Sequence, residues 1–496
     1  MAFLLQASGS QPQVTEQLLK DTWDAAYLEG SHVGYIHSVY KQLQVGERVV
    51  IEAVNEFDLT IARFGQRLHQ QFVVGNHETL EGKVLAVIMW QTLSKDQRLV
   101  LKGKVENNRL LATLRVGDQP AIEKPIAWDP KALGLYQQEL LYKRLSLKAG
   151  EKVTYRRYEP VFHTILTSEL EVIGEEEVGL LDGQKSRLVR VVQRTQKVED
   201  IHLPAAVLWI DRQGEVRKGQ QELPGLGTLV TYRTTREVAT RPVQARVDVG
   251  LGQLIRVKQT IRQPDRAIQA VYAIQVRDLD DLEKIFPQDE RQYVRRIRGD
   301  TVELVVKQAA VPHEDQEGAA PAELAPYLKS NHYVRADSPQ VRKLASQAVG
   351  RETEPWAKAR RIAAWVNEHI RDKNFSEAFA TADEVARRLE GDCTEHAILA
   401  AAMCRASGIP ARPVVGLVYV PSRRAFGYHM WLEVWVYGRW HAMDPTLGLD
   451  QVGITHIKLA DHHWNDVQTL TPLLPVVRVL GRIQIEVMSV QYWETK

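Results

Sequence analysis

Apolar and polar residues alternate along most of residues 22–306, in short runs separated by Gly, Asn and Asp. A period of two is typical of strands that bury one face and expose the other, and short connections favour antiparallel neighbours. The pattern therefore predicts a large antiparallel β region. Its first predicted strands are 23–28, 33–40, 49–61, 78–92, 98–105 and 110–116.

Residues 130–145 break this alternation, because Leu133, Tyr136, Leu140 and Leu141 recur near helical spacing. We expect a helix there that covers one face of the sheet. After Gly150 the alternation starts again, which makes a duplication of one β unit, as 22–148 and 149–310, one interpretation of this region. The further predicted strands are 152–166, 170–177, 185–195, 205–210, 228–238, 254–261 and 267–276.

The pattern changes to helices after 311–335, a segment whose acidic, Ala- and Pro-containing centre has few residues able to join a core. Helices beside an antiparallel sheet define an α+β domain. The predicted organisation is an unassigned segment 1–21, the β region 22–310, a linker 311–335 and an α+β domain 336–496. In this domain we expect helices at 338–348, 355–370, 383–389 and 393–407, and strands at 412–420, 428–436, 439–443, 454–459 and 482–493.

The two parts should separate at the linker, because proteases cut chains where few contacts cross. One alternative remains open. The alternating strand predicted at 482–493 could pair with the N-terminal sheet instead of the C-terminal one, and this pairing would fuse both parts into one cooperative unit.

Cys393 stands at the predicted start of a helix, directly after Gly391 and Asp392. The first turn of a helix has unpaired backbone N–H groups and the positive end of the macrodipole, so it stabilises a thiolate relative to a thiol. Cys393 is therefore a candidate nucleophile, which needs a base and a group that orients the base. Cys404, on the apolar side of the same helix, is interpreted as a buried packing residue.

His429 and Asp444 can be placed relative to each other by strand parity. A two-residue turn at 437–438 is predicted to join two antiparallel strands. Counting outward from this turn puts Asp444 opposite Trp431 and on the same face as His429, as a diagonal neighbour roughly 7–8 Å away. A slip of one residue would send Asp444 to the opposite face, so the register can be checked.

Four motifs follow one another in the C-terminal part: Gly-Asp-Cys-Thr-Glu-His at 391–396, Gly-Ile-Pro-Ala-Arg at 408–412, His-Met-Trp at 429–431 and Asp-Pro-Thr at 444–446. This arrangement resembles the transglutaminase-like superfamily, in its bacterial branch. The resemblance implies a papain-like catalytic triad of Cys393, His429 and Asp444, with acyl transfer or hydrolysis at amide bonds of peptide or protein substrates. It does not choose between transglutaminases, peptidases and amidases, which share the triad.

A second class of function stays open beside the enzyme. Some members of the superfamily have lost activity, and a β region of this size exceeds what a compact thiol hydrolase needs. The alternative is a peptide-binding or scaffolding protein whose C-terminal domain is not catalytic. The reactivity of the Cys393 thiol separates the two hypotheses.

Two neighbours of the predicted triad have their own interpretations. His396 lies one helical turn after Cys393 and competes as the base, but it sits on the same helix and cannot approach from an opposing wall. Trp431, next to His429 on its face, is predicted to shield the histidine and the aspartate from water.

A cluster of metal-binding residue types occurs near the C-terminus, with Asp461, His462 and His463 adjacent and His456 and Asp466 nearby. Its spacing is not that of a zinc site, so a solvated polar loop is favoured. The sequence contains no EF-hand loop, phosphate loop or dinucleotide-binding glycine motif. We therefore expect no cofactor and no metal.

The composition excludes further classes. The 496 residues carry a formal net charge of +2 with scattered Lys and Arg, so nucleic acid is not an expected partner. Cys393 and Cys404 lie too far apart on one helix to form a disulfide. No apolar run reaches the roughly 18 residues of a membrane span. We expect a soluble protein, cytoplasmic or exported if a leader peptide is missing from this N-terminus, and its oligomeric state stays open.

Overall fold

The structure is a computed structural model of the chain, and it describes residues 14–493 apart from 96, 199–201, 278, 280, 310–321, 377–378 and 465–473. The chain divides into two compact units between Val249 and Gly250. Among the described residues, no helix has both the length and the apolar character that crossing a membrane requires.

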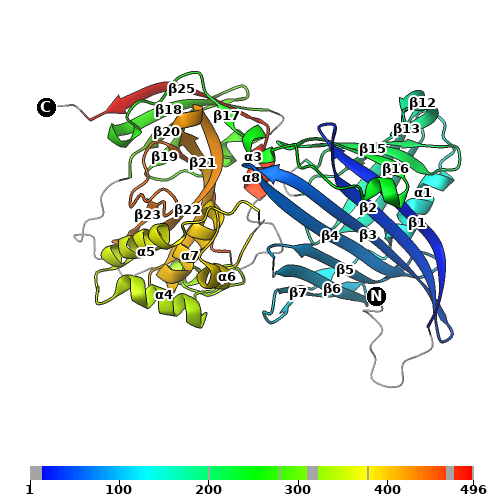
Figure 1. Cartoon of the computed structure of the whole chain (residues 1–496), viewed down its shortest axis with the longest axis horizontal. Helices are drawn as coiled ribbons and strands as arrows, with labels where there is room; N and C mark the ends of the chain where they lie inside the picture. The colour runs from blue at the N-terminus through cyan, green and yellow to red at the C-terminus, as the bar shows by residue number, and fades with distance from the viewer. Residues whose placement is uncertain are drawn as a thin grey trace. The chain divides into compact units, whose positions relative to one another are not determined.

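Most of the first unit is one 16-stranded sheet (Figure 1). Its strands are β1 (Val14–Leu28), β2 (Ser31–Val45), β3 (Arg48–Arg63), β4 (Gln66–Glu78), β5 (Val84–Thr92), β6 (Arg98–Glu106), β7 (Arg109–Val116), β8 (Ile122–Glu123), β9 (Ile126–Ala127), β10 (Ala132–Leu133), β11 (Lys152–Glu159), β12 (Thr164–Gly179), β13 (Lys185–Thr195), β14 (Ala206–Ile210), β15 (Val216–Leu223) and β16 (Gly227–Thr234). They lie in the order β10 to β16 and then β1 to β8, with β9 beside β7. The predicted antiparallel β region is confirmed. Among the described strands of this sheet, β10 and β11 are the one parallel pair.

β1 joins the two halves of the sheet. One edge of β1 pairs with β2 and the other with β16, so that Ala25 lies opposite Tyr35 on one side and Tyr232 on the other. The strands before and after Gly150 are therefore hydrogen-bonded into one sheet, and the duplication of one β unit over 22–148 and 149–310 stays a prediction. β1 also begins within the segment 1–21 that the sequence analysis leaves unassigned.

The alternation of apolar and polar residues does not predict β4 and β15. Both strands contain many polar residues and few apolar ones, so no apolar face stands out in their sequences. The alternation also merges the end of β4 with β5 into one strand, 78–92. A tight turn separates the two, in which the N–H of Gly82 donates to the carbonyl of Thr79 at 2.9 Å. Polar strands of this kind are set by their neighbours in the sheet more than by their own sequence.

Helix α1 (Leu135–Arg144) covers part of the sheet, over a shorter range than the predicted 130–145. Two residues of β4 bind its start: Asn76 accepts from the N–H of Leu135 at 2.8 Å, and Glu78 accepts from the N–H of Tyr136 at 2.9 Å. Burial raises the pKa of Glu78 to about 7. These contacts tie the helix to one face of β4. Helix α2 (Arg236–Ala239) follows the last strand of the sheet.

The second unit contains two smaller sheets and most of the helices. Its helices are α4 (Pro339–Val349), α5 (Pro355–His369), α6 (Ala382–Arg388), α7 (Cys393–Ala406) and α8 (Leu474–Val479), and α3 (Val249–Gly252) lies at the boundary. Its strands are β17 (Ile255–Arg256), β18 (Ala267–Val276), β19 (Gln292–Arg298), β20 (Thr301–Lys307), β21 (Ala411–Val420), β22 (Ala425–Val436), β23 (Arg439–Met443), β24 (His456–Asp461) and β25 (Ile483–Tyr492). Short 3₁₀ helices occur at Pro264–Arg266, Leu282–Lys284, Ala322–Tyr327 and Pro421–Arg423. The predicted α+β class is thus confirmed.

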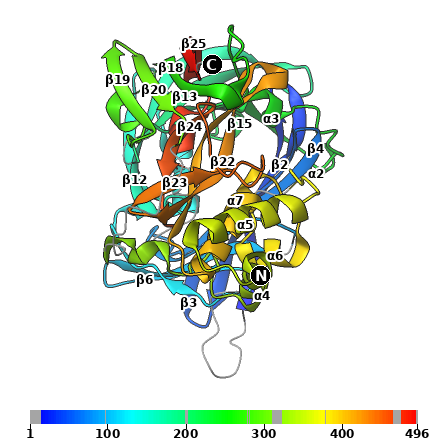
Figure 2. The same ribbon diagram turned by 90° about the vertical axis from the view of Figure 1, so that its left-hand side faces the viewer.

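The two sheets of this unit share one core. One sheet has the order β17-β22-β21-β24 with β23 on β22, and the other the order β19-β20-β18-β25. Tyr272 from the second sheet packs edge-on against Phe426 of the first, with ring centroids 5.5 Å apart, and its hydroxyl donates to the carbonyl of Ile454 at 2.8 Å. Figure 2 shows helices α4 to α7 gathered beside β22 and β23.

A buried ion network adds a second link between the two sheets. Lys458 on β24 is 1% exposed and pairs with Glu433 on β22 and with Asp289, which precedes β19. The side-chain amide of Gln292 donates to the carbonyl of Lys458 and accepts from its N–H, at 2.9 and 2.8 Å. Because a buried charge is stable only when paired, these residues require one another.

Residues 250–307 therefore belong to the second unit, and the predicted boundaries of the β region and of the domain 336–496 are corrected. The reason is long-range pairing: β25 pairs with β18, and β18 with β20. The alternative that 482–493 pairs with a strand of the predicted β region is confirmed, because β25 pairs with β18, which covers the strand predicted at 267–276. Residues 311–321 of the predicted linker lie outside the described residues, and residues 322–335 lie within the second unit.

We predict that a fragment of residues 250–496 folds cooperatively and that a fragment of residues 336–496 does not. The shorter fragment lacks β18 and β20, so β25 loses β18, the strand that it pairs with, and the side chains of Tyr419 and Phe426 are exposed. Each fully buried side chain contributes roughly 1.5–3 kcal/mol, against a typical total stability of about 5–15 kcal/mol. Urea unfolding followed by tryptophan fluorescence measures both fragments. A cooperative transition in 336–496 that matches that of 250–496 would contradict the prediction.

Candidate active site

Cys393 is the first residue of α7, as the sequence predicts. Asp392 caps the helix by accepting from the N–H of Thr394 at 2.8 Å, and Glu395 accepts in return from the N–H of Asp392 at 2.9 Å. Gly391 has φ +147°, and a Cβ there would lie 2.3 Å from the Cβ of Glu395. The glycine and the capping box therefore define where the helix begins and hold Cys393 at that point.

The surroundings of the two cysteines differ. Cys393 is partly exposed, whereas Cys404 is fully buried in the same helix. Burial raises the pKa of the Cys404 thiol to about 12, which leaves it protonated and unreactive. The capping hydrogen bonds use the N–H groups of Asp392 and Thr394, on either side of Cys393, and not the N–H of Cys393 itself.

The strand register that places His429 and Asp444 is confirmed. Val436 pairs with Arg439 across the two-residue turn, and Leu432 pairs with Met443. Tyr437 and Gly438 have φ of +50° and +78°, which a turn of type I′ requires. This register brings the next residue of the chain, Asp444, onto the face that carries His429.

Asp444 is fully buried and accepts several hydrogen bonds. Its Oδ2 accepts from Nε2 of His429 at 2.8 Å. Its Oδ1 accepts from the N–H groups of Thr446 and Leu447 at 2.9 and 3.2 Å. The carboxylate is thereby held in one orientation, and Nδ1 of His429 is left for another partner.

Cys393 and Asp444 both act on the His429 ring. Burial alone lowers the pKa of His429, but the charge of Asp444 and then that of Cys393, with hydrogen bonds to both, raise it to about 10. Burial alone also raises the pKa of Asp444, and the two histidines beside it hold that pKa well below its ordinary value. At neutral pH these interactions favour a protonated His429 beside the negative charge of Asp444.

His456 on β24 is a member of this site that the sequence analysis does not identify. Its Nε2 donates to Oδ2 of Asp444 at 3.0 Å, and its Nδ1 lies 3.2 Å from the hydroxyl of Thr455. The ring is fully buried, and burial lowers its pKa, so it is neutral. The sequence does predict a strand at 454–459 that contains His456. Nothing in that stretch indicates which strand it pairs with, so the contact with Asp444 could not be predicted.

The three residues His429, Asp444 and His456 offer ligand atoms within 4.8 Å of one another, as a metal site would. The distances fit hydrogen bonds better: both nitrogens lie at 2.8–3.0 Å from the same carboxylate oxygen. A protonated His429 has no lone pair to give a metal. We therefore interpret His429, Asp444 and His456 as a hydrogen-bonded cluster and not as a metal site.

The residues of the other metal-like cluster have separate partners. Asp461 pairs with Arg412 and Lys458, and the carbonyl of His463 accepts from Arg405 at 2.9 Å. His456 faces Asp444, and Asp466 lies outside the described residues.

His396 and Trp431 occupy the positions that their strand and helix predict. His396 is buried, its Nδ1 lies 2.6 Å from the carbonyl of Asp392, and burial lowers its pKa. Trp431 is fully buried, with its ring edge-on to His456 at 5.2 Å and stacked near His429 at 6.3 Å. A Cβ on Gly416 would lie 2.5 Å from the Trp431 ring, so this glycine makes room for the indole.

Comparisons with known proteins locate the same region. Residues 342–445, which contain Cys393, His429 and Asp444, match the transglutaminase-like superfamily. No curated protein matches the chain.

Three solved structures resemble parts of the chain. A candidate cysteine protease from Cytophaga hutchinsonii is 14% identical, with a TM-score of 0.33, covering 46% of this chain and 92% of that one. The periplasmic domain of TgpA from Pseudomonas aeruginosa, bound to ethylmercury, is 16% identical, with a TM-score of 0.22 and coverage of 37% and 92%. A β-barrel-like protein from Brucella abortus is 9% identical, with a TM-score of 0.30 and coverage of 44% and 98%. By its motifs and by the match over residues 342–445, the second unit of this chain carries a domain of the transglutaminase-like superfamily.

Proposed function

We propose that the protein is a thiol-dependent enzyme that transfers or hydrolyses acyl groups at amide bonds of peptide or protein substrates. In this proposal Cys393 is the nucleophile, His429 the acid and base, and Asp444 the group that orients and stabilises the imidazolium. The observation that carries it is the hydrogen bond from Nε2 of His429 to the buried Asp444 at 2.8 Å, together with Cys393, which acts on the same ring and helps to raise its pKa. A buried packing cysteine or a core histidine would not need this partner set.

The proposed reaction uses the Cys393 thiolate as the nucleophile and the protonated His429 as the acid. The Cys393 thiolate attacks the substrate carbonyl carbon, and the carbonyl electrons move to the oxygen, which accepts a hydrogen bond from the N–H of Cys393. The tetrahedral intermediate collapses as Nδ1 of His429 gives its proton to the leaving amine, which leaves a thioester. A water or a second amine then gives a proton to His429 and attacks the thioester, and the thiolate is released.

Hydrolysis is the default outcome of the second step. Water is present at every exposed site, and Cys393 is partly exposed. Transfer to an amine requires a site that excludes water or binds the amine ahead of it. The acyl acceptor is therefore a property of the substrate cleft and not of the three residues.

We predict that Cys393→Ala abolishes turnover of a peptide library while the fold stays intact, because the change removes only a thiol at a helix start. The matched control is Cys404→Ala, which removes a fully buried thiol at a cost on the order of 1 kcal/mol and keeps activity. Peptide cleavage measured by mass spectrometry, with melting temperatures for both variants, checks this. Equal behaviour of the two variants would remove Cys393 from the mechanism.

The non-catalytic alternative predicts a different thiol. If the C-terminal domain only binds peptides, iodoacetamide should label Cys393 at the rate and with the pH dependence of an ordinary free cysteine. The enzyme hypothesis predicts faster labelling at neutral pH. Labelling needs no substrate, so it decides between the hypotheses even before a substrate is known.

We predict that Asp444→Asn lowers turnover by two or more orders of magnitude and moves the alkaline limb of the rate–pH profile to lower pH. The pKa of His429 is raised to about 10, mainly by the charge of Asp444, so protonated His429 persists up to that pH and is lost above it. Removing the charge lowers this pKa, and protonated His429 is then lost earlier. Turnover measured from pH 5 to about 10 checks the shift. An unmoved alkaline limb would contradict the assignment.

We predict that His456→Leu lowers turnover about 10- to 100-fold, because it removes a hydrogen bond to a buried charge. His456→Gln should retain most of the activity, because its amide can donate to Asp444 from a similar position. Comparing the two variants separates the loss of the hydrogen bond from a packing defect. If both variants keep full activity at all pH values, His456 does not position Asp444.

A further inference from the structure

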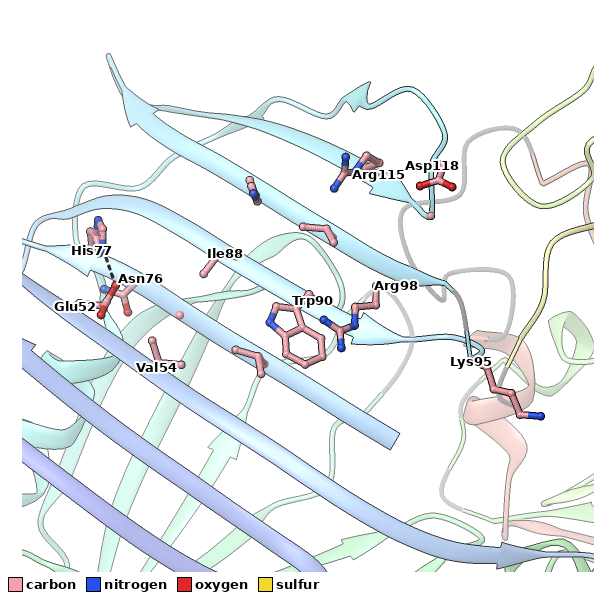
Figure 3. Close-up of a pocket in the computed structure, with 15 residues that line it drawn as sticks. Glu52, Val54, Asn76, His77, Ile88, Trp90, Lys95, Arg98, Arg115 and Asp118 are labelled. Carbon is pink, nitrogen blue, oxygen red and sulfur yellow. Dashed lines mark hydrogen bonds and ion pairs between the residues drawn. The ribbon is translucent and has the colours of Figure 1, made fainter. Parts of the chain in front are cut away.

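A hollow of about 540 Å³ opens on the sheet of the first unit, lined by strands β3 to β7 and the loops at their ends (Figure 3). Its volume lies within the roughly 300–1,000 Å³ that is typical of small-molecule sites. Asn76 and Glu78 bind helix α1 on one side of β4. The alternate residues Gly75 and His77 therefore face the other side, which carries the hollow.

The middle of the hollow is apolar. Val73 lies opposite Trp90, and Trp90 lies opposite Val100, so the three form one row across β4, β5 and β6. Ile88 lies in the next row, opposite Gly75. A Cβ on Gly75 would lie 3.1 Å from Ile88, so the glycine leaves depth where a side chain would fill the floor.

Three cations surround Val100. Arg98 and Lys102 stand two residues before and after it on the same face of β6, and Arg115 lies directly opposite it on β7. Arg115 is thus a diagonal neighbour of both, with backbones roughly 7–8 Å apart. Long side chains at this spacing can converge on one small anion.

The charges of the hollow are unevenly distributed. At one end Glu52 is bonded to His77 at 3.3 Å, and at the other end Asp118 follows β7 and lies near Arg115 (Figure 3). The guanidinium of Arg98 lies 4.5 Å from the centre of the Trp90 ring, and Figure 3 shows the two side by side. Among the residues that the structure describes, neither Arg98 nor Arg115 has a carboxylate at ion-pair distance. At this end Arg98, Lys102 and Arg115 outnumber the single carboxylate of Asp118, so the end is complementary to an anion and the apolar floor beside it to a hydrocarbon.

We propose that this hollow binds an amphipathic anion, a carboxylate joined to a long alkyl chain. The carboxylate lies among the three cations, where an arginine fork can bind both oxygens. The chain lies over Trp90 and Ile88 and contributes through apolar area removed from water. A free anion would leave this floor unused, and an uncharged chain would leave Arg98 and Arg115 without a carboxylate to bind.

Binding of dodecanoate to the full chain tests the proposal, measured by displacement of a dansyl-labelled undecanoate. We expect saturable displacement at one site. Arg98→Gln and Arg115→Gln should each weaken binding about tenfold, because each removes one charge-assisted hydrogen bond. The matched control is Arg109→Gln, an exposed arginine at the other end of β7 and outside the hollow, which should leave binding unchanged.

Three further probes identify what is bound. Dodecyltrimethylammonium has the same chain with the opposite charge, and displacement by it as strong as by dodecanoate would overturn the proposal. Acetate or inorganic phosphate binding as tightly as dodecanoate would reduce the hollow to a free-anion site and also overturn it. Tighter binding of an acidic peptide would do the same. Trp90→Ala should weaken the binding of dodecanoate more than that of acetate. Melting temperatures of all variants show whether a substitution disturbs the fold. If one does, dodecyltrimethylammonium and the short anions, measured on the unaltered chain, decide whether the proposal holds.

Discussion

The carboxylate of Asp444 is the interaction on which the candidate active site depends. It is fully buried, and an uncompensated carboxylate in such a place would cost several kcal/mol. Two imidazole rings and two backbone N–H groups compensate it. Because these partners come from β22, from β24 and from the loop after β23, the carboxylate draws three separate elements to one point.

β21 makes this convergence possible. It lies between β22 and β24, with Gly416 opposite His429 and Val418 opposite His456. Residues 416 and 418 share a face of β21, so both histidines project to the same side of the sheet. The missing side chain at Gly416 leaves room for the ring of Trp431, which packs against both imidazoles and excludes water from that side.

The sheet that contains β18 packs against the sheet that carries the candidate active site. Tyr272 packs against Phe426, and Lys458 holds Glu433 and Asp289 in one buried network. The network lies on the strands that carry His429 and His456, so residues 250–307 stabilise the site without contributing to its chemistry. The large sheet of the first unit has a different character, since its hollow combines cations with an apolar floor.

The sequence alone determined what local rules control. The period of two, the type I′ turn at 437–438 and the capping signal before Cys393 each depend on a few neighbouring residues, and these predicted the α+β class, the start of α7 and the shared face of His429 and Asp444. The tertiary structure decided what depends on distant partners. β25 pairs with β18 more than 200 positions earlier, β1 joins β16, and β24 brings His456 to Asp444 through β21. A strand's own pattern states which face is buried but not which strand lies beside it, because that choice depends on the fit of two faces that the chain brings together only on folding.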